Sequence, residues 1–280
     1  ECLIVICIAW KAFEVSRQKG ELVDPKSVFK EYVVYCSPLI VYSFLGFAYN
    51  FADRWMLQSF GGPTEQGLFE VGYRFAGVGL VATTSMLNIF WKEIAEAKER
   101  GDHELVHRLY RKTSRFLFTL GALLCGFLIP WSDEIARTLL GESYVAGAPV
   151  LVVMFLFMVF NSLAQINIVL ILASSKTKTH LVLGGLCMVA GIPLSYFFQA
   201  PQDFWISGLE LGAIGMACKM LIMIIIRSNL IGWWYARSMG MKFDWTYQVV
   251  SLGASVCCGW GAYLLTIRIL PEFMNHIFVR

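Results

Sequence analysis

The sequence predicts an all-α protein, a polytopic bundle of transmembrane helices, and three observations support this fold class. First, 57% of the 280 residues are hydrophobic and only 15% are charged, whereas soluble domains average about 45–50% apolar and about 25% charged residues. A soluble chain of this length has too small a core to bury so much apolar surface. Second, apolar stretches long enough to cross a bilayer recur along the chain. Third, basic residues concentrate in alternate connections between these stretches.

The apolar stretches predict where the chain crosses the membrane. A helix needs about 20 apolar residues to cross the hydrocarbon core, and it satisfies its own backbone hydrogen bonds there. We expect a partial span followed by seven fuller ones, at residues 2–10, 33–60, 67–91, 116–131, 147–173, 181–199, 207–234 and 247–270. The apolar start and the residues after 270 also lead us to expect that both termini are truncated.

The distribution of charge predicts the orientation of these spans. Connections on one side carry 17 basic residues and those on the other side carry two, so the rich side is expected to be cytoplasmic. This assigns residues 11–31 to a cytoplasmic loop and 92–115 to a cytoplasmic amphipathic segment, with a helix at 91–112 on the membrane surface. The net charge of only +3 gives no indication of a nucleic-acid partner. The eight cysteines lie in apolar stretches without a C-x-x-C pair, and we expect neither disulfides nor metal ligands among them.

Charged residues within the predicted spans are the main candidates for function, because a charge inside the bilayer is costly and must face protein or water. Asp53 and Arg54 share a helical face with Asn50, and Glu70 and Arg74 lie on the polar face of the next span, which also carries Asn88. A short turn joins the two spans, so we expect Asp53, Arg54, Glu70 and Arg74 to form one charged cluster. Two interpretations remain open: a water-accessible cavity that binds an anionic head group, or an ion-pair cluster that fastens two helices.

Lys219 is the third cation within a predicted span. It follows Gly208, Gly212 and Gly215 at helical spacing, on a face of small residues that favours close helix packing. Lys219 therefore either lines a cavity or has a structural role. The candidate substrate-binding residues are Arg54, Arg74, Lys219, Asn50 and Asn88, with Asp53 and Glu70 as charge partners or coupling groups. We expect no catalytic residue, metal or cofactor.

One motif suggests a different class of protein. His103-Glu104-Leu105-Val106-His107 reads H-E-x-x-H, the pattern in which two histidines on one helical face bind zinc and the glutamate acts as general base. A membrane zinc metalloprotease is therefore an alternative. Asp102 is expected to cap a solvated basic helix here, and the nearby sequence offers no third ligand, which disfavours this alternative.

Several segments resemble polysaccharide flippases of the Wzx type, in the multidrug/oligosaccharidyl-lipid/polysaccharide exporter superfamily. The resemblance is carried by Ser37-Pro38-Leu39, Asn50-Phe51-Ala52-Asp53-Arg54, Gly67-Leu68-Phe69-Glu70-Val71-Gly72-Tyr73-Arg74, Leu140-Gly141-Glu142-Ser143-Tyr144 and Ala148-Pro149-Val150-Leu151. It implies a two-lobe MATE-like exporter, with residues 1–10 ending a preceding helix, 32–234 forming the second six-helix lobe and 247–270 an additional helix. Glu70 beside Arg74 departs from the positive charge expected of a diphosphate cavity.

The resemblance also implies a function. Such proteins flip undecaprenyl-diphosphate-linked oligosaccharides, the repeat units of O-antigen, capsule or exopolysaccharide, to the outer leaflet of the bacterial inner membrane by alternating access. The expected partners are this lipid-linked substrate, membrane lipids and a coupling ion, H⁺ or Na⁺. A cation-coupled multidrug exporter of the same fold is the alternative, and it would have acidic rather than basic residues dominating its cavity.

Overall fold

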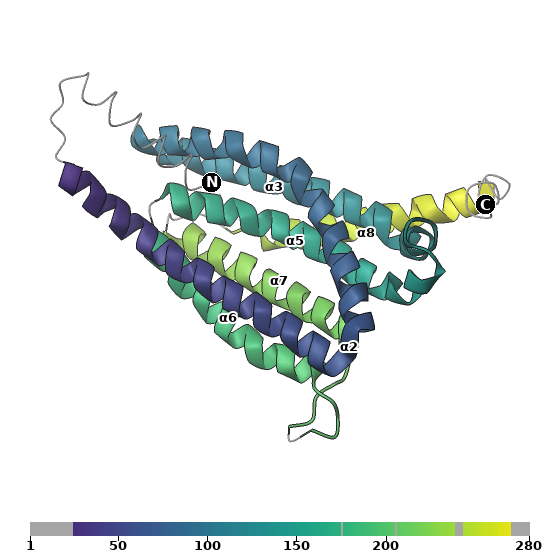
Figure 1. Ribbon diagram of the computed structural model, residues 1–280. Helices are drawn as coiled ribbons and strands as arrows, with labels where there is room; N and C mark the ends of the chain where they lie inside the picture. The colour runs from purple at the N-terminus through teal and green to yellow at the C-terminus, as the bar shows by residue number, and fades with distance from the viewer. Residues whose placement is uncertain (1–24, 175, 205, 239–242, 270–280) are drawn as a thin grey trace.

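The computed structural model describes residues 25–174, 176–204, 206–238 and 243–269, and this part of the chain consists of helices and connections without a strand (Figure 1). Side chains are described there except at 25–28, 78–86, 88, 238 and 269. The long helices are α2 (Pro25–Glu99), α3 (His103–Leu128), α5 (Ala148–Ala173), α6 (Thr177–Gln199), α7 (Gly212–Ser238) and α8 (Trp245–Ile269). Short helical turns, η1 (Ile129–Trp131), α4 (Ser132–Ile135), η2 (Ala136–Leu140) and η3 (Glu142–Gly147), connect α3 to α5. The all-α prediction is confirmed.

Within the described residues, six helical segments are long and apolar enough to cross a membrane, so the protein is a multi-pass membrane protein. The predicted spans at 147–173, 181–199 and 247–270 agree closely with α5, α6 and α8. The predicted span at 207–234 begins too early, because α7 starts at Gly212. The predicted partial span at 2–10 and most of the connection at 11–31 lie outside the described residues.

Helix α2 contains two of the predicted spans, 33–60 and 67–91, joined by a sharp bend. The bend is at Gly62, which has φ 79° and ψ −178° and is followed by Pro63. A positive φ favours glycine, which lacks the Cβ that would strain this conformation. Figure 1 shows the two arms of α2 as a V, with the first arm (25–61) drawn purple and the second (63–99) drawn blue. The helical backbone is therefore broken at Gly62, within the turn predicted at 61–66.

Helix α5 lies at the centre of the bundle, between α3 and α7 (Figure 1). It carries no charged residue over its 26 positions, and most of its side chains are buried. A helix that is apolar on every side is stable only when it is surrounded. Its core contacts include Phe118 of α3 and Ala217 of α7, which pack with Met154 and Phe155.

The predicted amphipathic helix at 91–112 is instead a tight reversal between two helices. Helix α2 ends at Glu99, and Asp102 caps α3 by accepting a hydrogen bond from the Leu105 amide at 2.9 Å. The amphipathic pattern is real, but its apolar side packs inside the protein: Ile94 and Tyr110 belong to a buried cluster with Ile166 of α5. The single-helix prediction failed because a neighbouring helix, rather than a lipid surface, covers the apolar stripe.

The parts of the basic connections that the structure describes at 92–115, 174–180 and 235–246 meet at one end of the bundle. Lys98 Nζ donates to the Ala173 carbonyl at 3.3 Å, Lys176 Nζ lies 5.2 Å from the centre of the Trp234 ring, and Arg111 pairs with Asp244 at 3.2 Å. Burial, together with the nearby Lys176, lowers the pKa of Lys98. The charge pattern requires these connections to lie on the same side, and the contacts agree. That this side is cytoplasmic stays a prediction.

Helix α8, the predicted additional helix, packs directly on α3. A Cβ atom on Gly259 would overlap the carbonyl of Gly126, and one on Gly126 would overlap the carbonyl of Ser255. Such contacts between small residues bring helix backbones close together, as is common in membranes.

Large apolar side chains of the first arm of α2 point away from the bundle. Phe44 is 75% exposed, and Ile40, Phe47 and Phe51 each exceed 60%. An apolar surface of this extent requires lipid or another protein surface to cover it.

Candidate functional site

The four charged residues predicted to form one cluster belong to two separate groups. Consecutive residues of a helix point about 100° apart, so Asp53 and Arg54 on the first arm of α2 face different surroundings. Asp53 is only 5% exposed and points toward α6 and α7, whereas the Arg54 side chain is 47% exposed. Asp53 makes its contacts with residues of the bundle interior and Arg54 with the second arm.

The exposed group consists of Arg54, Glu70 and Arg74, and we call it the arginine network. Arg54 Nη1 lies 3.1 Å from Glu70 Oε2, across the V of α2. Arg74 Nε donates to Glu70 Oε1 at 3.4 Å, one helical turn further along the second arm. The ring of Tyr73 lies beneath Arg54, with 6.0 Å between the guanidinium carbon and the ring centre. Two guanidinium groups thus share one carboxylate, which leaves a net charge of +1.

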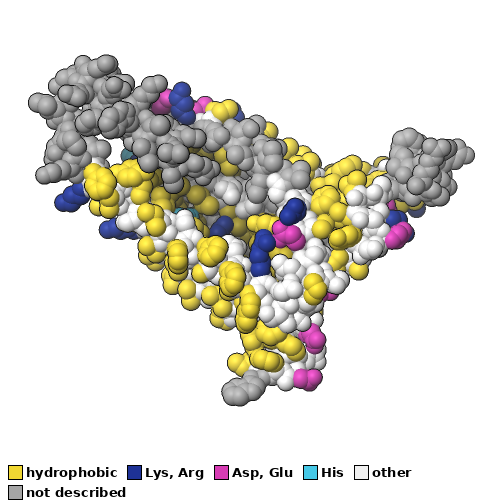
Figure 2. Space-filling view, in the orientation of Figure 1, with side chains coloured by type: hydrophobic (Ala, Val, Ile, Leu, Met, Phe, Trp, Pro, Cys, Tyr) yellow, Lys and Arg dark blue, Asp and Glu magenta, His cyan; other side chains and the backbone are white. Residues whose placement is uncertain are grey.

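The arginine network is accessible from outside the protein. The Arg74 side chain is 78% exposed, and the Glu70 side chain is 27% exposed. Figure 2 shows a small group of basic and acidic side chains over the middle of this face, among mainly apolar and uncharged surface. An anion that approaches this surface would meet guanidinium N–H groups suited to bidentate contacts with carboxylate or phosphate oxygens.

The buried group consists of Tyr49, Asp53, Ser195 and Lys219, and we call it the Asp53–Lys219 cluster. Lys219 Nζ pairs with Asp53 Oδ2. The Ser195 hydroxyl donates to Asp53 Oδ1 at 2.6 Å and approaches the Gly191 carbonyl at 3.0 Å. Lys219 Nζ also lies 4.1 Å from the centre of the Tyr49 ring. The cluster links α2, α6 and α7 within the interior of the bundle.

Lys219 has no exposed surface in this conformation. The structure therefore places it in contact with Asp53 rather than beside an open cavity. The predicted glycine face is also shorter than expected, because Gly208 lies in the connection before α7. Gly212 begins α7 with φ 53°, and the Glu65 carboxylate accepts the Ala213 amide at 2.7 Å there, where an acidic group complements the helix dipole.

The two asparagine candidates differ in what the structure describes. Asn50 is exposed on the same side of α2 as Arg54, and its amide donates to the Gly46 carbonyl at 2.7 Å. Asn50 thus lies one helical turn from Arg54, which belongs to the arginine network. The side chain of Asn88 lies outside the described residues.

The H-E-x-x-H motif occupies the start of α3. Glu104 is exposed and pairs with Arg108 at 3.3 Å, so its carboxylate is directed to a neighbouring cation. Among the described residues, no group of three histidine, cysteine or acidic side chains is arranged to hold a metal ion. The metalloprotease alternative therefore has no geometric support in this part of the chain.

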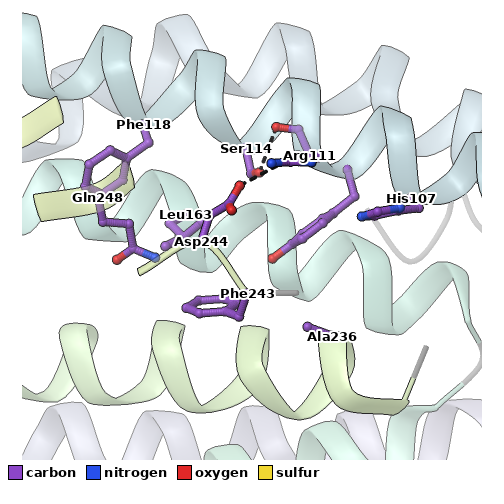
Figure 3. A pocket seen from close by; sticks show the side chains of 10 residues that line it. His107, Arg111, Ser114, Phe118, Leu163, Ala236, Phe243, Asp244 and Gln248 are labelled. Atoms are coloured by element: carbon purple, nitrogen blue, oxygen red, sulfur yellow. Dashed lines mark hydrogen bonds and ion pairs between the residues drawn. The ribbon is translucent and has the colours of Figure 1, made fainter. Parts of the chain in front are cut away.

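A small cavity of about 40 Å³ lies at the basic end, between α3, α7 and the start of α8. Figure 3 shows Asp244 directed toward Arg111, with His107 on the other side of the cavity. Arg115 also reaches the same Asp244 oxygen, with Nη2 at 2.6 Å. The cavity has room for a few water molecules but not for a diphosphate or a sugar. It is a polar junction that ties α8 to α3.

Several partners of these groups were not among the predicted site residues. Ser195 reaches Asp53 across 142 positions of sequence, and Asp244 meets two arginines of α3. Lys219 was a predicted site residue, but its pairing with Asp53, 166 positions away, was not predicted. Tyr49 precedes Asp53 by one helical turn, and this spacing is the one signal in the sequence that places it beside Asp53.

Comparison with known proteins gives a family and a fold. The MatE family profile matches residues 38–197. Among solved structures, an outward-facing multidrug resistance MATE family transporter of the MOP superfamily is similar with a TM-score of 0.66 and 14% identity, covering 79% of this chain and 48% of that one. A MOP superfamily transporter from Pyrococcus furiosus, described as having a binding pocket of reverse polarity, is similar with a TM-score of 0.62 and 15% identity. This match covers 84% of this chain and 54% of that one. This chain thus spans about half the length of each. No curated protein sequence matches.

Proposed function

Because this chain belongs to the MatE family, we propose that it forms the second lobe of an alternating-access transporter that flips undecaprenyl-diphosphate-linked oligosaccharides. The substrate moves from the cytoplasmic to the outer leaflet of a bacterial inner membrane. The cargo is a repeat unit of O-antigen, capsule or exopolysaccharide. Transport of this kind involves no covalent chemistry.

The observation that carries this proposal is the excess of guanidinium over carboxylate in the exposed arginine network. Arg54 and Arg74 share Glu70 as their carboxylate partner. A diphosphate must leave water in order to cross, and arginine forks replace part of its hydration with directed hydrogen bonds. The exposed apolar side chains of the first arm, including Phe47 and Phe51, suit the isoprenoid chain.

Each residue of the network has a role in the proposal. Arg54 and Arg74 bind the diphosphate, and Glu70 holds both guanidinium groups in place until the phosphate oxygens replace it. Asn50, and Asn88 by the sequence prediction, supply amide groups for sugar hydroxyls. A membrane potential that is negative inside favours outward movement of anionic charge by about 2.3 kcal/mol per charge per 100 mV. The proposed partners are the lipid-linked substrate, surrounding lipids and a coupling cation.

The proposal is tested by Arg74→Ala in cells that lack the chromosomal copy of the gene. Export of lipid-linked oligosaccharide is expected to be lost while the amount of protein in the membrane stays normal. Arg74→Lys is expected to recover part of the activity, since lysine keeps the charge but not the fork. Arg100→Ala is the matched control, because Arg100 is 74% exposed and pairs with Glu96 in the same i,i+4 manner. Full export by the Arg54→Ala, Arg74→Ala double variant would contradict the proposal.

A multidrug exporter of the same fold is the competing function, and the partly exposed Glu70 carboxylate is the feature that favours it. Its signature would be efflux of cationic dyes that Glu70→Gln abolishes, together with oligosaccharide export that Arg74→Ala leaves unchanged. The same set of strains measures both activities.

A further inference from the structure

Three helices converge on one buried ammonium group. Lys219 of α7 is completely buried, and its Nζ contacts the Asp53 carboxylate of α2 and the ring face of Tyr49 at 4.1 Å. Ser195 of α6 binds the other carboxylate oxygen at 2.6 Å. Tyr49 is held against α6, where a Cβ atom on Gly191 would contact its hydroxyl. The ammonium position is therefore defined by groups from every side of the α2, α6 and α7 interface.

The groups around Nζ are those that would bind a small monovalent cation. The Asp53 carboxylate, whose other oxygen accepts the Ser195 hydroxyl, is a hard oxygen ligand of the kind that alkali and alkaline-earth ions prefer, and an aromatic face attracts cations of any kind. The Asp53 carboxylate would leave a net negative charge without Lys219, and an uncompensated buried charge strongly favours uptake of a counterion. Lys219 supplies that counterion from within the chain.

We propose that the Asp53–Lys219 cluster is a monovalent-cation site occupied by a tethered ammonium group, so that this lobe does not take up Na⁺ there. Because the lysine cannot leave, the charge of the cluster changes only through protons. Other ionisable or charged groups on these helices include Tyr42 on α2, His180 and Cys187 on α6, and Cys218 and Arg227 on α7. This inference concerns the cation and does not depend on which substrate the protein carries.

The test compares the thermal stability of the purified full chain in NaCl and in choline chloride at equal ionic strength. The wild-type protein is expected to melt at the same temperature in both salts. Lys219→Ala removes the ammonium group and leaves the Asp53 carboxylate without a counterion, so Na⁺ is expected to raise its melting temperature by about 2–4 °C over choline. Lys219→Ser, which adds a hydroxyl ligand, is expected to respond in the same way.

Two variants control for effects unrelated to the site. Lys176→Ala also removes an ammonium group from an aromatic face, at 5.2 Å from the centre of Trp234, and no salt-specific response is expected. The Asp53→Asn, Lys219→Ala double variant lacks both charges and is expected to be insensitive to Na⁺.

Three results would overturn the proposal. The first is a wild-type protein stabilised by Na⁺ in a manner that Asp53→Asn abolishes. The second is folded Lys219→Ala and Lys219→Ser proteins that do not distinguish Na⁺ from choline. The third is failure of both single variants to fold in NaCl while the double variant folds, because Na⁺ would then be unable to occupy the position of the ammonium group.

Discussion

Asp53 and Arg54 are neighbours in sequence and opposites in environment. Asp53 is enclosed by α6 and α7 and is neutralised by Lys219, whereas Arg54 lies on an accessible face and shares Glu70 with Arg74. A rotation of about 100° around α2 separates the two positions. The comparison teaches that one helix can carry a buried, paired charge and an accessible charge side by side, because adjacent positions point to different surroundings.

The two groups also differ in how much stability they contribute. Removing one partner of a buried ion pair leaves an uncompensated charge in the protein interior. When one partner of an exposed ion pair is removed, water solvates the remaining charge and little stability is lost. The Asp53–Lys219 cluster is therefore expected to control folding, and the arginine network is expected to control activity. Substitutions in each group test this division.

The largest effect is expected for Lys219→Ala in sodium-free buffer. Loss of the ammonium group leaves Asp53 buried without its counterion, at a cost of about 3–5 kcal/mol in the free energy of unfolding. Chemical unfolding of the purified protein measures this value. The Asp53→Asn, Lys219→Met double variant removes both charges and is expected to recover most of the loss. A single variant as stable as the wild type would refute the structural role of the pair.

A smaller loss of stability is expected for Ser195→Ala, which removes the hydroxyl donor to Asp53 Oδ1. A hydrogen bond to a charged group contributes about 1.5–3 kcal/mol, and unfolding measurements on the same preparation detect that range. Ser114→Ala serves as control, because its exposed hydroxyl donates to the Arg111 carbonyl at 3.3 Å, one turn away on the same helix. Equal losses of unfolding free energy in the two variants would show that the hydrogen bond from Ser195 to Asp53 stabilises the protein no more than an exposed hydrogen bond does.

Arg54→Ala is expected to separate stability from activity. Its side chain is half exposed, so the change in unfolding free energy should stay below about 1 kcal/mol, while export of the proposed substrate falls to background. Parallel measurements of unfolding and of export decide the point. Severe unfolding of this variant would assign the arginine network a structural role as well.

The smallest effect is expected for Lys92→Ala. Lys92 is 80% exposed and lies 3.9 Å from Glu96, and exposed i,i+4 pairs contribute about 0.2–0.5 kcal/mol to a helix. Neither unfolding nor export should change measurably. This variant sets the baseline against which the effects at Arg54 and Lys219 are judged, and a large loss of export would extend the functional surface to the end of α2.

Hydropathy was sufficient to predict the helices, because a segment that crosses lipid must be long, apolar and internally hydrogen-bonded. The match between the predicted span at 147–173 and α5 illustrates this. The break at Gly62 falls within the predicted turn at 61–66, but the sequence did not indicate that only Gly62 would leave the helical conformation. The prediction of a surface helix at 91–112 was wrong, because the periodicity of a sequence identifies an apolar face without identifying what covers that face.

The candidate site was predicted in part for a related reason. The contacts of Glu70 with Arg54 and Arg74 follow from two antiparallel arms and helical spacing, and they were expected. The pairing of Asp53 with Lys219 was not expected. Sequence spacing gives the angle between residues around one helix, but not which face of that helix is turned toward the bundle. That direction depends on α6 and α7, which are distant in sequence.

The Asp53–Lys219 pair also has a consequence for how the protein is made. The two residues are separated by 166 positions, and at a synthesis rate of about 5–20 residues per second the ribosome needs roughly 10–30 s to proceed from one to the other. During this interval the first arm of α2 enters the membrane with an acidic residue whose partner does not yet exist. A carboxylate in that position is costly in lipid, so the nascent helix is expected to remain beside the insertion machinery until α7 emerges and the lobe closes.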